Sequence, residues 1–236
     1  MKKLHACLLA AAVVGIGLAE REGSAQDGAP TASERDRALA QLTTQQQEAA
    51  RTAQTYHAMD NATLLKRLVE QSTAKQEPFN SLAFRELKGR PDVDPAVLVS
   101  LVREMENGNA LLPLLLLRRN KETYLTLPAE LRARVLTDAL QTSVRFNTWG
   151  LPGFYLEDAS KALIETGDAA VPVLRGMLSN TSPAPVFGSQ EYMLFRRYQF
   201  RLCDYALFFL EKIRSNAGFV MPESVAERDA LIRDLK

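Results

Sequence analysis

One short motif occurs twice in this sequence and constrains the fold more than any other feature. Residues 108–115 read GNALLPLL and residues 167–174 read GDAAVPVL, so both follow G-[ND]-A-x-x-P-x-L. Glycine permits the left-handed turn that ends one helix, and Asn or Asp caps the next. Proline fits the first helical turn, where no backbone N–H is needed. The motif therefore predicts two helix–turn–helix units, with Asn109 and Asp168 as the caps.

Helical periodicity continues through the residues around these turns. Asp94 followed by Pro95 is typical of a helix start, and Leu98 and Val102 then fall on one face. Ser224 and Glu227 have the spacing of a capping box for a last helix. No run of residues alternates as a half-buried strand would. Further apolar rows are Leu64, Leu65, Leu68 and Val69; Leu131, Val135 and Ala139; Leu156, Ala159, Leu163 and Ile164; and residues 194–213, which we expect to form one long helix.

The stretch before this helical region is more polar. Residues 26–77 are expected to form a linker followed by two leader helices, and residues 78–236 the main helical domain. The first leader helix begins near Ser33, with Asp36 completing a variant capping box. Its heptad-spaced row has weak occupants, which favours a polar helix over a coiled coil. That row is Leu39, Leu42, Gln46, Ala49, Ala53 and Tyr56.

The segment around the second motif resembles a HEAT-type helical repeat. Glu157–Leu178 reads EDASKALIETGDAAVPVLRGML, with the small residues, Gly-Asp pair and Val-Pro pair common in that superfamily. Residues 108–115 carry Asn in place of Asp, and residues 196–235 fit only as a loose helical pair. The resemblance implies a right-handed α-solenoid of antiparallel helix pairs, with leader helices at the N-terminal end. It also implies protein binding and no catalytic residues.

Residues 1–25 have the features of a cleaved export signal. Lys2 and Lys3 precede an uncharged, mostly apolar stretch over residues 6–19, and residues 23–25 are small, as signal peptidase requires. Roughly 14 apolar residues fall short of the about 20 that cross a bilayer. This pattern predicts a signal peptide and no integral membrane segment after its removal.

The mature chain is expected to begin at Gln26, or at Glu20 for an earlier cut, and to be periplasmic or secreted. Removal of residues 1–25 takes three of the 29 basic and two of the 28 acidic residues, which leaves 26 of each. A neutral chain has no general attraction to nucleic acid. Cys203 is then the only cysteine, so no internal disulfide forms, and its apolar surroundings predict a buried thiol.

Few residues are available for catalysis or metal binding. His57 is the only histidine of the mature chain, which excludes zinc sites built from several histidines, and we expect it on the surface. No glycine-rich phosphate loop occurs. Carboxylates are the only plentiful acid–base groups, and their close pairs have simpler roles as helix caps or first-turn charges. These pairs are Asp92/Asp94, Glu104/Glu106 and Glu157/Asp158. The sequence predicts no cofactor and no metal.

Two aromatic segments are candidate binding surfaces. Residues 145–155 contain two glycines and a proline, which predicts a loop, and this loop carries four aromatic rings. Either the rings cover the core, or they contact a partner protein as interface anchors do. The four are Phe146, Trp149, Phe154 and Tyr155. In residues 194–205 the aromatics form a core row, so Arg196, Arg197 and Arg201 are interpreted as a solvated edge.

Taken as a whole, the sequence predicts an exported, non-catalytic scaffold that binds another protein through a helical-repeat surface. Two alternatives remain open at this point. One is a carboxylate-dependent hydrolase of envelope glycans, which needs two carboxylates across a cleft. The other is a structural assembly factor of the cell envelope with a permanent partner.

Overall fold

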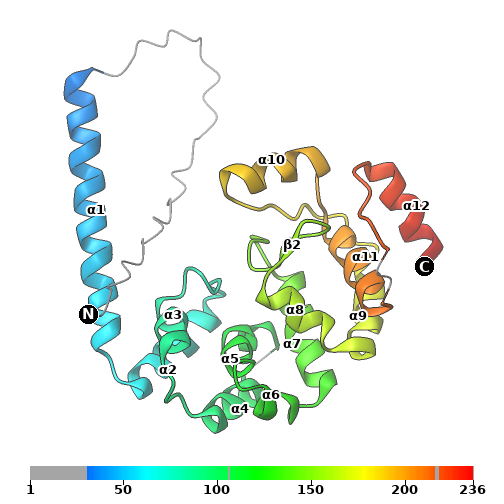
Figure 1. Cartoon of the computed structure of the whole chain (residues 1–236), viewed down its shortest axis with the longest axis horizontal. Coiled ribbons are helices and arrows are strands. Elements are labelled where there is room, and N and C mark those ends of the chain that lie inside the picture. The colour runs from blue at the N-terminus through cyan, green and yellow to red at the C-terminus, as the bar shows by residue number, and fades with distance from the viewer. Residues whose placement is uncertain (1–30, 106, 216–217, 236) are drawn as a thin grey trace, which may run out of the picture. The chain divides into compact units, whose positions relative to one another are not determined.

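The computed structural model describes residues 31–105, 107–215 and 218–235, and the chain divides into two units, Met1–Glu48 and Ala49–Lys236. The described residues are mostly helical (Figure 1). They form twelve α-helices, two 3-10 turns and one antiparallel pair of two-residue strands. The all-α class is therefore confirmed. None of the described helices is long and apolar enough to cross a membrane. The expected signal peptide, residues 1–25, lies outside the described residues.

Most elements follow one another with short connections, and longer segments lie around the hairpin, before α10 and between α11 and α12. In order they are α1 (Ala32–Ala58), α2 (Asn61–Thr73), α3 (Leu82–Gly89), α4 (Pro95–Glu104), η1 (Asn107–Ala110), α5 (Leu111–Leu117), α6 (Lys121–Leu125), α7 (Ala129–Gln141), β1 (Gly150–Leu151), β2 (Tyr155–Leu156), α8 (Asp158–Ile164), η2 (Gly167–Ala170), α9 (Val171–Met177), α10 (Ser189–Tyr198), α11 (Leu202–Ile213) and α12 (Val225–Leu235).

The first helix, α1, is polar along its whole length and has no buried residue. Its capping box differs from the expected one. Thr31 Oγ1 accepts from the Glu34 N–H at 3.3 Å, and the Glu34 carboxylate accepts from the Thr31 N–H at 2.7 Å. The box therefore lies two residues before the expected Ser33–Asp36 pair, because Thr31 and Glu34 have the same three-residue spacing and the Thr-x-x-Glu sequence of a regular capping box.

In the unit Ala49–Lys236, helices pack mainly on helices that are near them in sequence. Helix α2 packs on α3, α4 on α5, and α9 and α12 on α11. Helix α7 contacts η1, α5, η2, α8 and α9, so it joins the earlier helices to the later ones (Figure 1). The buried apolar side chains form one core cluster that extends from Leu64 to Ile232. Burial of such a continuous core is the main source of stability for this unit.

The repeated motif forms the same local structure at both places. Each copy is a 3-10 turn, η1 or η2, that leads directly into a seven-residue α-helix, α5 or α9. Both turns pack against α7. The two glycines nevertheless act differently. Gly167 has a φ of +58°, the expected left-handed turn, whereas Gly108 lies where a Cβ would come within 3.0 Å of Ala139. Gly108 is thus required for the close approach of η1 to α7.

The expected caps of this motif are wrong, although others are confirmed. Neither Asn109 nor Asp168 forms a side-chain cap of α5 or α9, because each 3-10 turn continues into its helix and leaves no break to cap. Asp94 does cap α4, accepting from the Ala96 N–H at 2.8 Å, with Pro95 in the first turn. At the last helix, Ser224 Oγ accepts from the Glu227 N–H at 3.5 Å.

The long helix expected over residues 194–213 is two helices. Helix α10 ends at Tyr198 and is followed by Gln199, which has a φ of +50°, and α11 begins at Leu202. The break has a local cause in the backbone. Leu202 N–H donates to Ser182 O and Ala184 N–H donates to Phe200 O, both at 2.9 Å. These bonds to the preceding segment satisfy backbone groups that a continuous helix would have used.

A cluster of charges follows that break, so Arg201 is not on the solvated edge that the sequence indicated. Its guanidinium contacts Asp204 at 3.0 Å and Asp229 at 2.7 Å. Asp204 and Arg228 are fully buried, and Arg228 Nε lies 3.0 Å from the Asp204 carboxylate without hydrogen-bond geometry. Arg196 and Arg197 are exposed as expected. Helix periodicity places residues on a face but does not reveal which partners arrive from another helix.

Candidate functional site

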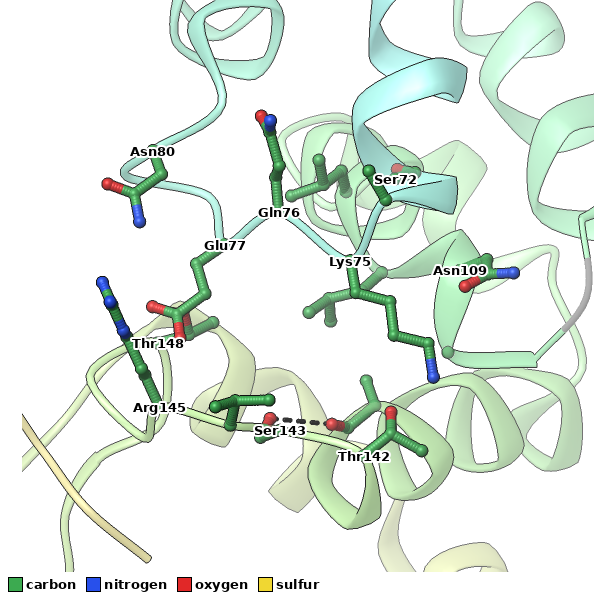
Figure 2. A pocket seen from close by; sticks show the side chains of 16 residues that line it. Ser72, Lys75, Gln76, Glu77, Asn80, Asn109, Thr142, Ser143, Arg145 and Thr148 are labelled. Carbon is green, nitrogen blue, oxygen red and sulfur yellow. Dashed lines mark hydrogen bonds between the residues drawn. The ribbon is translucent and has the colours of Figure 1, made fainter.

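A groove with a volume of about 350 Å³ opens between three segments of the second unit. The segments are residues 72–80 at the end of α2 and beyond it, residues 108–112 in η1 and α5, and residues 139–148 at the end of α7 and beyond it. Figure 2 shows their side chains, with Lys75 on one side of the groove and Arg145 on the other. The packing of η1 on α7, which Gly108 permits, brings two of the three walls together.

The end of α2 places Lys75 in the groove. The Lys75 N–H donates to Ser72 O and the Gln76 N–H to Gln71 O, both at 2.9 Å, which is the Schellman arrangement. The residue at this position has a left-handed backbone and is usually glycine, but here Lys75 has a φ of +53°. Figure 2 shows the Lys75 side chain extending along the groove toward Thr142.

Glu77 follows two residues later and is partly buried in the same groove. Burial raises the pKa of its carboxyl group to about 7, and the charge of Arg145 and a hydrogen bond from Thr148 offset this only in part. The Thr148 hydroxyl lies 3.5 Å from Glu77 Oε2. A carboxyl group with this pKa changes charge near neutral pH, as groups at functional sites often do.

The segment after α7 forms the third wall, and two buried aromatic residues of this segment anchor it to the core. Trp149 is fully buried, and its Nε1 donates to Ser143 Oγ at 2.9 Å. The Phe146 N–H donates to Pro185 O at 2.8 Å. These contacts hold the backbone on both sides of Arg145, whose guanidinium stacks 4.7 Å from the centre of the exposed Phe187 ring. The wall is therefore rigid, while Arg145 itself stays exposed.

Two buried polar atoms at the groove have no hydrogen-bond partner among the described residues. They are Ser72 Oγ, on a side chain with 3% of its surface exposed, and Asn109 Oδ1. An unpaired buried polar atom costs about 1–3 kcal/mol. Such atoms are rare in native structures, and each calls for an explanation. Both atoms therefore have hydrogen-bonding capacity that the described residues do not use.

The ionisable side chains that line this groove are Lys75, Arg145 and Glu77. Among the described residues that line it, Glu77 is the one carboxylate, whereas a glycosidase uses two. No histidine or cysteine lines the groove, and the described part of the chain contains no group of three potential metal ligands. With Lys75 and Arg145 present, the lining is positively charged whether Glu77 is ionised or not.

A second cavity of about 580 Å³ lies beside α3, α4 and α5, and two of its three cations, Arg90 and Arg119, have hydrogen-bond partners. Arg90 donates to Asn61 Oδ1 and to His57 O, both at 2.9 Å. Arg119 lies at hydrogen-bond distance from the backbone oxygen of Leu87. Because these side chains are engaged in holding neighbouring segments together, we assign the candidate site to the first groove.

The four aromatic residues nominated from the sequence separate into two pairs. Phe146 and Trp149 are buried, so the interpretation that the rings cover the core is correct for these two. The alternative of an exposed Trp149 in contact with a partner is wrong, because its indole is enclosed by the core and packs edge-on to Phe209. Phe154 and Tyr155 are exposed at the β1–β2 hairpin, and their partner-binding role stays a prediction.

The remaining sequence candidates lie apart from the groove. His57 is 83% exposed and contacts Glu86 at 3.1 Å, as expected for a surface residue. Cys203 is buried, and desolvation raises the pKa of its thiol to about 11, which makes it a poor nucleophile. Asp158 contacts Lys88 and Arg118 rather than a second catalytic group. Asp92, Asp94, Glu104 and Glu157 do not line the groove, and Glu106 lies outside the described residues.

Sequence reasoning missed Lys75 and Glu77. Both lie in a short polar connection, and such connections are usually solvated. One signal was present: a lysine stands where the end of a helix favours glycine. Arg145 was included in the aromatic segment but was not singled out there. The groove itself forms only when segments about 30 residues apart meet, which no local pattern reveals.

Comparison with protein-family models, curated proteins and solved structures found no match for this chain.

Proposed function

We propose that this chain is a non-catalytic scaffold that binds another protein, and that the groove between α2, η1 and α7 is its binding site. The observation that carries the proposal is the set of unmet interactions at the groove. Lys75 and Arg145 form no ion pair among the described residues, and Ser72 Oγ and Asn109 Oδ1 lack hydrogen bonds. A partner that supplies these interactions gains affinity that solvent alone does not provide.

The proposed architecture is a HEAT-like, right-handed α-solenoid of antiparallel helix pairs. The packing of successive helices on one another and the identical turn–helix structure of the two motif copies support it. In such proteins each repeat contacts its neighbours, and one surface of the stack serves for binding. Export to the periplasm or the medium, after removal of residues 1–25, is part of the same proposal and rests on the sequence pattern alone.

Photo-crosslinking tests the proposed site. A photo-reactive amino acid at position 144, where Val144 is 80% exposed at the groove, should link to a partner in cells that produce the protein. The same amino acid at Val173, an exposed position on α9, serves as the control. We expect a defined adduct at 144 that disappears with Arg145→Ala. Equal adducts at both positions, or adducts that survive Arg145→Ala, would place binding elsewhere.

A hydrolase of envelope glycans is the second candidate, because the raised pKa of Glu77 is what a general acid needs near neutral pH. Incubation with peptidoglycan fragments distinguishes the two. Release of reducing ends by the wild-type protein, lost in Glu77→Gln, would support the enzyme. A structural assembly factor differs from a scaffold in its permanent partner, and co-elution of a stoichiometric complex from envelope extracts would identify it.

A further inference from the structure

The charges at the groove favour a particular kind of partner. Lys75 and Arg145 lie on opposite sides of it, and neither forms an ion pair among the residues that the structure describes. Arg145 is instead stacked on Phe187. Two cations facing one concave space attract anionic groups, and carboxylates are the anions that proteins offer most commonly.

The hydrogen-bonding groups of the groove further restrict the chemical class of the partner. Asn109 Oδ1 is an acceptor and needs a donor, whereas the Ser72 hydroxyl can donate to an oxygen. A free carboxylate provides no donor. A peptide segment provides both, since its backbone N–H donates and its acidic side chains accept. Val144, which is exposed at the groove, offers apolar contact to a peptide but little to a small anion.

We infer that the groove binds an acidic peptide segment of the partner protein, with carboxylate side chains paired to Lys75 and Arg145 and a backbone N–H directed at Asn109. This inference rests on the proposed function, because it identifies the chemistry of the partner at the same site.

Glu77 makes this binding depend on pH. Its carboxyl group faces Arg145 and Thr148 from the third wall and follows Lys75 on its own segment. On α7, Asp138 accepts from the Gly108 N–H at 2.7 Å. An ionised Glu77 repels an acidic ligand and competes with it for Arg145. A neutral Glu77 can instead donate a hydrogen bond to the ligand carboxylate. Binding therefore raises the pKa of Glu77, and affinity falls as the pH rises through the free-state value of about 7.

The test uses a fluorescein-labelled, acetylated and amidated tetraglutamate peptide, with tetraglutamine and tetralysine peptides as matched probes. Fluorescence anisotropy should show that tetraglutamate binds most tightly. If only the neutral form of Glu77 is competent, affinity should decrease by up to about tenfold from about pH 6 to about pH 8. Glu77→Gln should bind at the higher pH as tightly as the wild type at the lower pH, and should lose the pH dependence.

The cation variants provide the second measurement. Lys75→Ala and Arg145→Ala should each weaken tetraglutamate binding by up to about fivefold, the upper end for an ion pair of exposed side chains. Lys161→Ala, at an exposed lysine of α8, should leave it unchanged. Circular dichroism shows whether each variant is folded.

Three results would overturn the inference. These are equal binding of the glutamate and glutamine probes, tighter binding of tetralysine, and no binding of any probe. None of them contradicts the proposed function as long as the adduct at position 144 forms and depends on Arg145. If that adduct does not form but tetraglutamate still binds, the proposal of a protein partner is refuted and the groove is a site for anions in general.

Discussion

The charges buried near α11 are paired with one another, whereas the charges at the groove are not. Asp204 contacts Arg201 and Arg228, and Arg228 also donates to backbone oxygens of Tyr198 and Glu223 at 2.6–2.7 Å. At the groove, Lys75 and Arg145 form no ion pair among the described residues. Buried charges that satisfy each other hold helices together. Charges that the fold positions without an ion pair are available to a ligand, and this difference separates the two regions.

The largest effect is expected from the paired region. Asp204→Asn removes the carboxylate that two arginines share and leaves Arg228 buried without compensation, which should reduce the free energy of unfolding by about 3–5 kcal/mol. Urea unfolding measures it. Asp229→Asn is the matched control, because Asp229 pairs with Arg201 but is 43% exposed, and it should cost under about 1 kcal/mol. Similar values for the two variants would mean that the cluster is not a buried unit.

At Glu77 we expect the removal of a carboxylate to increase the free energy of unfolding instead of reducing it. Its folded-state pKa of about 7 lies above the ordinary value of 4.5, so the folded chain holds a proton that the unfolded chain releases. Stability therefore falls as the pH rises from about 4.5 to about 7. Glu77→Gln removes this loss and should stabilise the protein by about 1–2 kcal/mol at about pH 8, after allowance for its partial exposure. The variant and the wild type should unfold alike at about pH 4. Destabilisation at the higher pH would contradict a desolvated carboxylate.

Lys75 offers a direct contrast between stability and binding. Lys75→Gly relieves the left-handed backbone and should raise the free energy of unfolding by about 0.5–1 kcal/mol, while weakening tetraglutamate binding. Gln199→Gly tests the same backbone effect outside the groove, at the end of α10 where φ is +50°. It should stabilise to a similar extent and leave binding unchanged. If Lys75→Gly does not affect binding, the lysine side chain has no role in the groove.

The smallest change in the free energy of unfolding is expected at Asp168, a carboxylate that belongs neither to the buried charge cluster nor to the groove. Asp168 is exposed and does not cap α9. Asp168→Ala should change the free energy of unfolding by no more than about 0.5 kcal/mol in a denaturant melt. A loss above about 1 kcal/mol would restore the helix-capping role that the sequence predicted.

Local signals predicted much of the fold. The Asp94–Pro95 start of α4, the left-handed turn at Gly167 and the apolar rows of α7 and α8 depend on residues within one or two turns. Such signals act over a few residues, so a single sequence is enough to detect them. The α10–α11 break was missed because its cause lies in backbone bonds to residues 182–184.

The candidate site was not predictable to the same degree. Arg145 and Trp149 belonged to a segment that the sequence singled out. Trp149, however, is buried and holds the wall of the groove through its bond to Ser143 instead of facing a partner. Glu77 has its raised pKa only because other segments desolvate it. The role of Gly108 follows from the approach of α7, which lies about 30 residues further along the chain. Burial and proximity of this kind depend on tertiary packing, and no periodicity or spacing encodes them.

The most direct test of the groove as binding site is a two-dimensional amide NMR titration of the isotope-labelled protein with the tetraglutamate peptide at about pH 6. We predict saturable shifts concentrated on residues 72–80, 108–112 and 139–148, the three walls of the groove. The amide chemical shifts of the residues around Arg90 and Arg119 in the second cavity should not change. Shifts that centre on the second cavity, or that spread over exposed lysines and arginines without saturation, would contradict the account.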